Sequence, residues 1–556
     1  MNRFRRFIAS LPAGDKAIAG ALSVCVVLAC ASGLAALIRH YQIVVPAYGG
    51  TLTEGVVGSP RFDNPLLANS DADRTLTELT FAGLMGHDSK GALVPVLAES
   101  YTVSPSGTVY TFTLRKGVEF SDGTPVTADD VAFTIQKAQD PALKSPEYSN
   151  WSNVRAEAVD ARTIRFTLPK PYAPFLEDAT LGILPKHVWQ NVSDEQFAFS
   201  SYNTNAIGAG PYVVSSVGVA ADGTITSYSL SSFRKFALGR PYISHIRLSF
   251  FATQNELTTA YENGTVKAAY GDAKQGALSV PYARVFAVFF NADQNAALKN
   301  LGVRKALSFA IDRTTLTKQA LGGYATPLNG PLPAGTDVPA VPLPNDATRL
   351  QDARDALTSA GYKYDDSAHT WSKAGTTLTM TITTSNVPEL KVVAGQVQKD
   401  WQSLGVPTEI EFQDPSSLAQ SVIRPRNYGA LLFGEVVGTQ PDLYAFWSST
   451  ERDAPGLNIA NYSNTDVDTL LSQARTQSDP TTRNATLAQI QEKIAADYPA
   501  AFLYTPDFVY DAQPGIQGIH LTSLSSPADR FWGIWSWYRY TEHVWPIFVH
   551  ARKSGA

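Results

Sequence analysis

Residues 97–135 read LAESYTVSPSGTVYTFTLRKGVEFSDGTPVTADDVAFTI and contain a strand, a turn and the start of a helix. Apolar and polar side chains alternate over residues 109–114, which is the period-two pattern of a half-buried strand. The Asp-Gly-Thr-Pro sequence that follows predicts a turn, because glycine admits positive φ and proline fixes its own φ. Thr127 lies three residues before Asp130, which is the spacing of a capping box and predicts that a helix begins there.

The N-terminus carries a long apolar segment. Residues 17–38 are 22 residues without a charge, and as a helix they span about 33 Å, enough to cross a bilayer core. Four basic residues precede the segment, so residues 1–16 are expected in the cytoplasm and the chain after residue 38 outside it. An uncleaved membrane anchor is the interpretation we adopt. The alternatives are acylation of Cys30 in an imperfect lipobox and cleavage near Ala31 or Ala36.

Charge and cysteine usage narrow the classes of partner. The net charge is −5, but residues 1–48 hold five basic residues and one acidic residue, so they carry +4 and the rest carries −9. An acidic exported part argues against nucleic acid as a partner. Cys25 and Cys30 are the two cysteines of the sequence, and both lie in the apolar segment. The exported part therefore has neither a disulfide nor a thiol metal site.

No catalytic or metal-binding signature is complete in the sequence. The eight histidines form no HExxH spacing, and no GxSxG, GxGxxG or P-loop sequence occurs. Ser232 and Lys235 do fit the SxxK pattern of acylating serines, but the accompanying S-D-N and K-T-G sequences are absent. We therefore expect a protein that is not an enzyme and that has no metal and no cofactor.

Several segments together resemble one known family, the family 5 extracellular solute-binding proteins. These are receptors of ABC importers for oligopeptides, dipeptides and, in some members, nickel. Beside residues 97–135, the segments are GAGPY at 208–212, YENG at 261–264, VRKALSFAIDR at 303–313, ARDALTSAGY at 353–362 and NYSNTDVDTLL at 461–471. The resemblance covers most of residues 49–510 in the family's order.

The resemblance implies an α/β fold of the periplasmic-binding-protein type, with two lobes and an extra inserted domain, after one N-terminal transmembrane helix. Two glycines, Gly271 and Gly276, are expected to absorb backbone rotation at a hinge between the lobes. The expected divisions are a basic terminus at 1–16, an anchor at 17–38, a linker at 39–48, lobe I at 49–80, 175–275 and 510–545, domain II at 81–174, lobe III at 276–509 and a tail at 546–556.

The resemblance also implies where a ligand lies. Peptide-binding members hold the ligand amine with the first aspartate of a D-P-D-P-Y-x-x-W segment, and the matching stretch here is QPDLYAFW at 440–447. Gln440 replaces that aspartate, so we expect Asp442 or Glu435 to bind the amine instead, or the ligand to be uncharged at that end. Further expected ligand contacts are Phe62, Asn64, Trp447 and Tyr504.

The function that the resemblance implies is capture of oligopeptides outside the membrane, by a monomer that delivers them to an ABC permease driven by separate ATPase subunits. A receptor for a nickel chelate or an oligosaccharide is one alternative, and a surface sensor or chaperone without a transport role is another. The tryptophan-rich residues 531–548 are expected to pack on lobe I, with contact to the membrane as the alternative.

Overall fold

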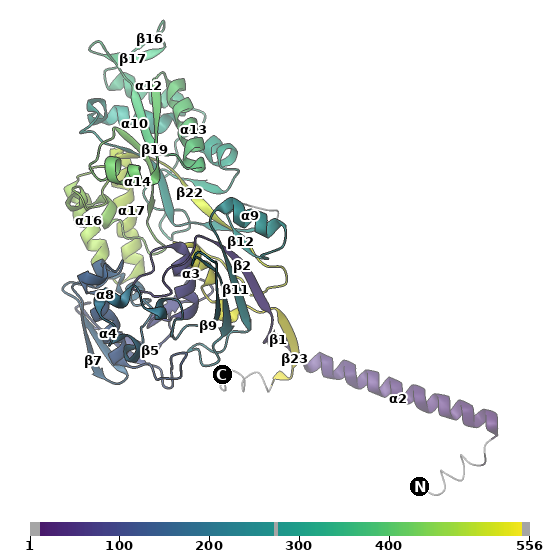
Figure 1. The fold of residues 1–556 in the computed structure, drawn as a ribbon. Coiled ribbons are helices and arrows are strands. Elements are labelled where there is room, and N and C mark those ends of the chain that lie inside the picture. Colours follow the sequence, from purple (N-terminus) through teal and green to yellow (C-terminus); the bar gives the residue numbers. More distant parts are fainter. Residues whose placement is uncertain (1–9, 11, 272–275, 547–556) are drawn as a thin grey trace.

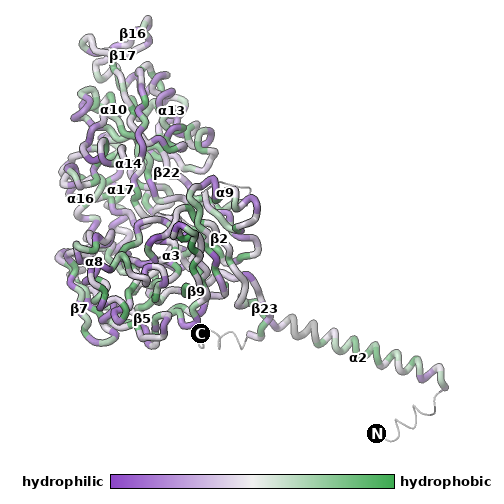
Figure 2. Tube along the Cα trace, viewed as in Figure 1, coloured by the Kyte–Doolittle hydropathy of each residue, from purple (hydrophilic) through white to green (hydrophobic). Residues whose placement is uncertain are grey.

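The computed structural model describes residue 10, residues 12–271 and residues 276–546 (Figure 1). One long helix, α2 (Ala13–Tyr41), stands away from a body made of two lobes with a further domain beside them. Its residues Ala13–Leu34 form a helix long and apolar enough to cross a membrane, and Figure 2 shows the apolar residues along it. Most of residues 1–16 and of the tail at 546–556 lie outside the described residues.

Lobe I is built on a four-stranded sheet of order β2-β11-β10-β9. Strands β2 and β11 are parallel, although nearly two hundred residues separate them, and the other pairs are antiparallel. Helix α3 packs against the short helix η7, which comes from the C-terminal part of the chain. The bounds are β2 (Thr51–Val57), α3 (Asp71–Thr80), β9 (Tyr212–Val219), β10 (Ile225–Ser232), β11 (His245–Phe251), α9 (Gln254–Glu262) and η7 (Pro527–Phe531).

The inserted domain holds the 97–135 stretch in an antiparallel sheet of order β5-β6-β8-β7. The predicted alternation is confirmed, because Tyr110, Phe112 and Leu114 of β6 are buried. The predicted helix start is also confirmed, since the Thr127 N–H donates to Asp130 at 2.8 Å and α4 begins at the next residue. The bounds are β3 (Met85–His87), β4 (Leu93–Pro95), β5 (Ala98–Val103), β6 (Val109–Leu114), α4 (Ala128–Ala138), β7 (Arg155–Asp160) and β8 (Thr163–Thr167).

Lobe III surrounds an eight-stranded sheet whose main order is β12-β22-β14-β21-β19-β20. Successive residues of β14 enter different cores, with Val288 packing under α10, α12 and α13 and Phe289 under α16 and α17. The strands are β14 (Arg284–Phe290), β15 (Ala325–Pro327), β19 (Met380–Ser385), β20 (Thr408–Gln413) and β21 (Ala430–Val436), and the helices are α10 (Leu301–Ala310), α12 (Arg349–Ser359), α13 (Pro388–Leu404), α16 (Thr465–Thr476) and α17 (Pro480–Asp497). A small sheet of β16 (Lys363–Asp365), β17 (Thr370–Lys373) and β18 (Thr376–Thr377) extends from the far end.

Strand β22 (Ala500–Asp511) joins the two lobes. Its first residues pair with β14 inside lobe III, and its last residues pair with β12 (Ala269–Tyr270) and β13 (Leu278–Pro281) at the chain crossing. In lobe I, Tyr510 of the same strand donates a hydrogen bond of 2.9 Å to the buried Glu54. Glu54 forms an ion pair with Arg530, and both side chains are fully buried. One strand is therefore fixed in both lobes.

The expected linker at residues 39–48 contains regular structure that the sequence analysis did not predict. Helix α2 continues to Tyr41, and β1 (Ile43–Ala47) pairs antiparallel with β23 (Tyr540–Val544). The valines of this segment favour a strand, but a strand forms only where a partner strand pairs with it. That partner lies about 500 residues away in the sequence, so the pairing could not be read from the segment itself. The segment that follows α2 and the last strand of the described chain thus meet in a two-stranded ribbon.

Candidate functional site

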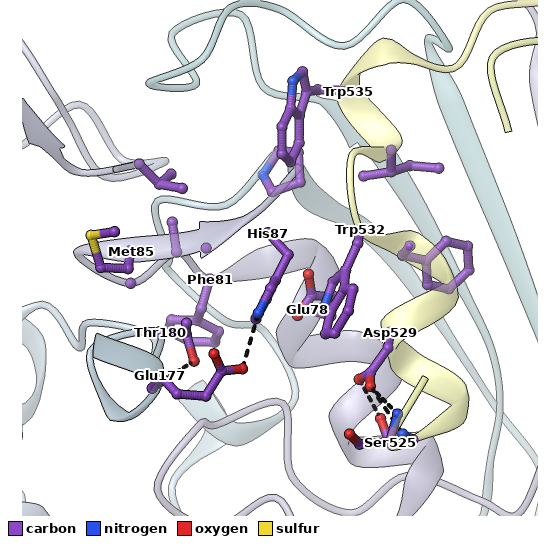
Figure 3. Close-up of a pocket in the computed structure, with 18 of the residues that line it drawn as sticks. Glu78, Phe81, Met85, His87, Glu177, Thr180, Ser525, Asp529, Trp532 and Trp535 are labelled. Atoms are coloured by element: carbon purple, nitrogen blue, oxygen red, sulfur yellow. Dashed lines mark hydrogen bonds and ion pairs between the residues drawn. The ribbon is translucent and has the colours of Figure 1, made fainter. Parts of the chain in front are cut away.

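A cavity of about 290 Å³ lies where lobe I, the inserted domain and one loop of lobe III meet. Its walls come from the end of α3, from β3, from the loop before α7 (Lys186–Trp189) and from η7 with the residues after it (Figure 3). Thr439, in the loop that follows β21, lines the cavity from lobe III. The Thr439 N–H donates to the Ser525 hydroxyl at 3.0 Å, so a hydrogen bond joins the two lobes at the cavity.

Aromatic rings form one wall of the cavity. The His87 ring stacks on Trp532, with 3.8 Å between the ring centroids and 18° between the planes. The edge of the imidazole faces Glu177, and His87 Nε2 lies 2.9 Å from Glu177 Oε1. Figure 3 shows Trp535 farther along the same wall. Flat rings of this kind offer a ligand large contact area at a small loss of side-chain entropy.

Two carboxyl groups lie on the lobe I side of the cavity. Glu78 stands at the end of α3, and enclosure by the protein together with the nearby Asp529 raises its pKa to about 8. Burial also raises the pKa of Asp529, although it accepts hydrogen bonds from the backbone of Ser525 at 2.7 Å and Ser526 at 3.0 Å. Glu78 therefore holds its proton near neutral pH, and a cation beside it can replace that proton.

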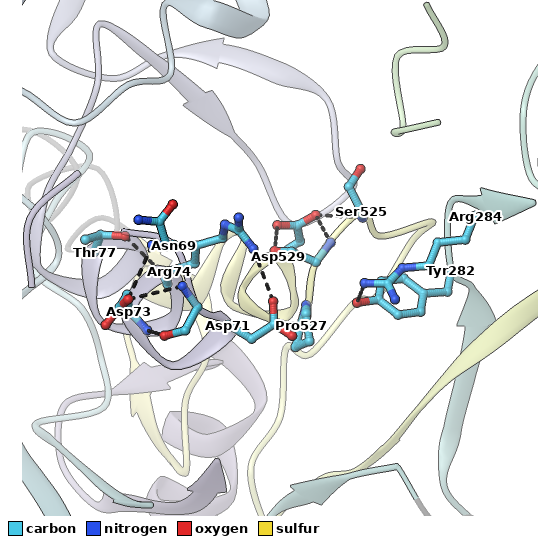
Figure 4. Close-up of polar contacts among 12 residues, drawn as sticks. Asn69, Asp71, Asp73, Arg74, Thr77, Tyr282, Arg284, Ser525, Pro527 and Asp529 are labelled. Atoms are coloured by element: carbon cyan, nitrogen blue, oxygen red, sulfur yellow. Dashed lines mark hydrogen bonds and ion pairs between the residues drawn. The ribbon is translucent and has the colours of Figure 1, made fainter. Parts of the chain in front are cut away.

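The chain crossing adds a cation beside this acidic side (Figure 4). Arg284, at the start of β14, donates to the Tyr282 hydroxyl, and its guanidinium lies 3.9 Å from the centre of that ring. Its buried Nε has no hydrogen-bond partner among the described residues. Asp71 and Asp529 are near enough to raise the pKa of Tyr282, although burial is the larger cause. The crossing therefore places a guanidinium on a tyrosine that lies near Asp71, at the start of α3, and near Asp529 of η7, although Arg284 itself does not line the cavity.

The predicted contacts Phe62 and Asn64 lie in lobe I, where they have structural partners. Asn64 is fully buried, donates to Asn203 at 3.0 Å and accepts from the Leu66 N–H at 3.0 Å. Phe62 packs on the inserted domain's core, with the Arg61 guanidinium 5.2 Å from its ring. Neither residue lines the cavity described above.

Trp447 and Tyr504 lie in the interior of lobe III in this conformation. Trp447 is fully buried and packs against Phe502, with 5.6 Å between the ring centroids. The Tyr504 hydroxyl donates to Glu389 at 2.8 Å, and its ring stacks on Phe286 at 4.9 Å. Both side chains contribute to the core of the lobe here.

The two carboxylates proposed to replace the missing aspartate differ in their surroundings. Asp442 forms an ion pair of 2.7 Å with Arg475, whose charge already balances it. Glu435 is 4% exposed, and neither of its carboxylate oxygens has a hydrogen-bond partner among the described residues. Burial raises the pKa of Glu435 well above its usual value. Gln440 accepts a hydrogen bond of 2.9 Å from Arg483.

The segment around Asp442 contacts the inserted domain. Arg475 lies 4.0 Å from the centre of the Tyr444 ring and 5.8 Å from that of Tyr172. The Ala173 N–H donates to the Arg475 carbonyl oxygen at 2.7 Å. This hydrogen bond joins lobe III to the inserted domain.

Both predicted hinge glycines have backbone angles that favour glycine, with φ of +114° at Gly271 and +94° at Gly276. A Cβ at Gly271 would lie 2.5 Å from the Gln254 side chain. The four residues between the two glycines are outside the described part of the chain.

Two further expectations concern chemistry. Lys235 of the SxxK pattern pairs with Glu119 at 2.6 Å, so its amine is directed away from a role as base for Ser232. Among the described residues, no group of three or more His, Cys, Asp or Glu side chains is placed to hold a metal ion.

Sequence reasoning missed the cavity residues Glu78, His87 and Asp529. Glu78 and Asp529 are about 450 residues apart; Glu78 belongs to no recognisable motif, and Asp529 belongs only to a capping box. The one available signal was the pair of capping-box spacings at Ser70 and Ser526. In the structure, a capping box forms at the start of α3 and another at the start of η7. That signal places the helices and says nothing about the cavity between them.

Comparison with known proteins identifies relatives across the exported part. The model of the bacterial extracellular solute-binding proteins, family 5 (middle), matches residues 92–455. The chain is 26% identical over 491 residues to the oligopeptide-binding protein AppA of Bacillus subtilis, covering 83% of this chain and 87% of AppA. It is 27% identical over 500 residues to the glutathione-binding protein GsiB of Pectobacterium atrosepticum, covering 82% and 89%. The crystal structure of NikZ from Campylobacter jejuni with Ni(L-His) superposes with a TM-score of 0.69 at 26% identity, covering 88% and 99%.

Proposed function

The chain belongs to the family 5 bacterial extracellular solute-binding proteins, and on that premise we propose that it captures oligopeptides outside the membrane for an ABC-type importer. The observation that carries the proposal is the enclosed cavity, which a lobe I wall and a lobe III loop share. A ligand that contacts both lobes binds the closed form better than the open form and so shifts the population toward it.

We propose that the ligand's ammonium group binds beside Glu78, with Asp529 adding a second negative charge. Asp442 is a weaker candidate because Arg475 already compensates it. Glu435 is the second candidate, since its carboxyl group is buried and has no protein partner. Arg284 is the proposed partner of a ligand carboxylate, because its guanidinium borders the same junction and has an unused N–H. Phe62, Asn64, Gln440, Trp447 and Tyr504 stay proposed contacts of a form with different side-chain positions.

The wider organisation is part of the same proposal. The body is a monomer divided as in the sequence analysis, with lobes that rotate about Gly271 and Gly276, and it has no catalytic role. Helix α2 stays uncleaved and holds the body on the outer face of the membrane, close to the permease. Acylation at Cys30 would replace the spanning helix by a lipid and leave the position of the body similar.

One observation favours a second ligand class. His87 and Glu177 together offer an imidazole nitrogen and a carboxylate at the cavity, and the relative NikZ is described in complex with Ni(L-His). Two protein ligands leave most of a nickel coordination shell to other donors, so the metal would enter as a chelate. Oligosaccharide capture and a role as a surface sensor or chaperone have no such support from the geometry.

The test is to purify the full chain in detergent, unfold it and identify any released ligand by mass spectrometry. The released compound is then added back while the thermal midpoint is followed, because a ligand that binds only the folded state raises it. Peptides that rebind support the proposal. A nickel chelate or a sugar refutes the peptide specificity, and no ligand together with no response to a diverse peptide pool refutes the transport role.

A further inference from the structure

The ribbon of β1 and β23 lies between helix α2 and the body (Figure 1). A single residue, Gln42, separates the end of α2 from the first residue of β1. The register pairs Ile43 with Val544, the last residue of the second strand, and Trp545 follows it in the chain. The end of the ribbon that adjoins the helix therefore carries Ile43, Val544 and Trp545 on neighbouring positions.

This end of the ribbon exposes large apolar side chains. Ile43 is 42% exposed, Val44 is 59% exposed and Trp545 is 38% exposed, and Tyr41 at the end of the helix is exposed as well. Successive strand residues point to opposite faces, so Ile43 and Val44 expose apolar surface on both faces of the ribbon. A two-stranded ribbon without a covering layer is marginally stable in water. An apolar environment at this end would both cover these side chains and support the pairing.

The other end of the ribbon is fixed to lobe I. The Tyr48 ring stacks on Tyr242 with 5.0 Å between centroids, and the Arg240 guanidinium lies 4.7 Å from the Tyr48 ring. The Gly49 N–H donates to the Tyr242 carbonyl oxygen at 2.8 Å. A Cβ at Gly49 would lie 3.0 Å from the Tyr540 ring, so the glycine lets the two strands approach here. The ribbon is thus a fixed extension of the lobe and not a loose tether.

We propose that the helix-proximal end of the ribbon lies among the lipid headgroups on the outer face of the membrane that α2 crosses. This end is formed by Tyr41, Ile43, Val44, Val544 and Trp545. The occupant of this apolar surface is phospholipid, because the ribbon follows directly on the helix whose residues Ala13–Leu34 are long and apolar enough to cross a bilayer. Tryptophan and tyrosine favour that zone, where the ring is in an apolar layer and its N–H or O–H reaches water. The inference rests on the proposed membrane anchorage.

The consequence is a body held at a set height and orientation. The three remaining residues of β1 span about 10 Å, so lobe I would stand roughly that far above the headgroups. A chain held by α2 alone could rotate about the end of its helix, whereas a second contact through Trp545 restricts that rotation. The cavity would then face the membrane in a limited range of orientations.

The test is quenching of tryptophan fluorescence by lipid. The full chain is reconstituted in phosphatidylcholine vesicles that carry a doxyl group near the headgroup, and vesicle flotation and peptide binding are measured on the same sample. The chain has nine tryptophans, so we expect a quenched fraction near one part in nine. Trp545→Phe should remove it. The matched control Trp371→Phe should leave it unchanged, because Trp371 is buried in β17 at the far end of lobe III.

Each outcome decides the matter. Loss of quenching in Trp545→Phe alone supports the inference. A chain that floats with the vesicles but shows no quenching, or the same quenching in Trp545→Phe as in the wild type, overturns it and leaves anchorage by α2 intact. A chain that does not float overturns the anchorage and this inference together, while peptide binding by that chain reports separately on the proposed function.

Discussion

Binding of a peptide with a free amino group should release protons, and Glu78→Gln should abolish that release. Glu78 has a pKa of about 8, so at pH 7 about nine-tenths of its carboxyl groups are protonated. An ammonium group placed beside Glu78 stabilises the carboxylate and lowers its pKa, and the proton leaves. We therefore expect about 0.9 proton released per peptide, less the 0.1 to 0.2 proton that the ligand's own α-amino group takes up.

Proton release is a sharper measure than affinity for this residue. A hydrogen bond to a charged group contributes about 1.5–3 kcal/mol, but the wild type must first lose its proton, which costs about 1.4 kcal/mol at pH 7. The two quantities nearly cancel, so Glu78→Gln should weaken binding at pH 7 by only about tenfold or less. The proton count, by contrast, changes from most of one proton to nearly none.

The assay is isothermal titration calorimetry at pH 7 in buffers with different ionisation enthalpies, with trialanine as the probe. N-acetyl-trialanine is the ligand control, since it has no ammonium group to bind. Glu435→Gln is the matched protein control, because Glu435 is also a buried carboxyl with a raised pKa. If release persists in Glu78→Gln and disappears in Glu435→Gln, the ammonium group binds at Glu435 and the argument for Glu78 is refuted.

Three other predictions concern residues around the cavity and the lobe junction. Arg530→Met leaves the fully buried Glu54 without its ion-pair partner and should lower the free energy of unfolding, measured in urea, by about 3–5 kcal/mol. The double variant with Glu54→Leu should recover most of that loss, because no unpaired charge is then buried. Equal losses in the single and double variants would contradict the prediction. Desolvation raises the pKa of the buried Asp63 to about 7, so the folded state binds more protons than the unfolded state between about pH 4 and 7. The free energy of unfolding therefore falls as the pH rises through this range. Asp63→Asn should remove that pH dependence and stabilise the protein above pH 7, which urea titrations at several pH values would reveal. Arg284→Gln should weaken binding of trialanine by about tenfold or more and leave binding of trialanine amide, which has no carboxylate, unaffected. A similar loss of affinity for both ligands in calorimetry would exclude a contact between Arg284 and the ligand carboxylate.

Sequence alone predicted the features that depend on neighbouring residues. The Thr127 and Asp130 spacing determines where α4 begins because both groups lie in one helical turn. The alternation over residues 109–114 buries one face because a strand turns successive side chains to opposite sides. The family resemblance then predicted the two-lobed α/β fold. The family match and the structure confirm that fold.

The cavity could not be predicted in the same way, because its chemistry is made by packing. Glu78 is an ordinary polar residue of α3 until η7 brings Asp529 next to it, and the raised pKa arises from that enclosure. Conversely, Asp442 looked like a free carboxylate in the sequence, and its partner Arg475 is reached only when α16 folds against the loop. Strand β1 could not be predicted for the same reason, since its partner strand lies at the other end of the chain.

The contacts that join lobe III to the rest of the body explain why a ligand could control the arrangement. Hydrogen bonds from Thr439 to Ser525 and from Ala173 to Arg475 join lobe III to the rest of the body. Beside the chain crossing, the Ala283 N–H donates to the Leu524 carbonyl oxygen at 2.7 Å, and the Leu524 N–H donates to the Pro281 carbonyl oxygen at 3.1 Å. Each contributes about 0.5–1.5 kcal/mol net. Strand β22 is fixed in both lobes, through β14 at one end and Glu54 at the other. A ligand that spans Glu78 and Arg284 would add contacts of comparable strength across the same gap, and that is sufficient to change which arrangement is more populated.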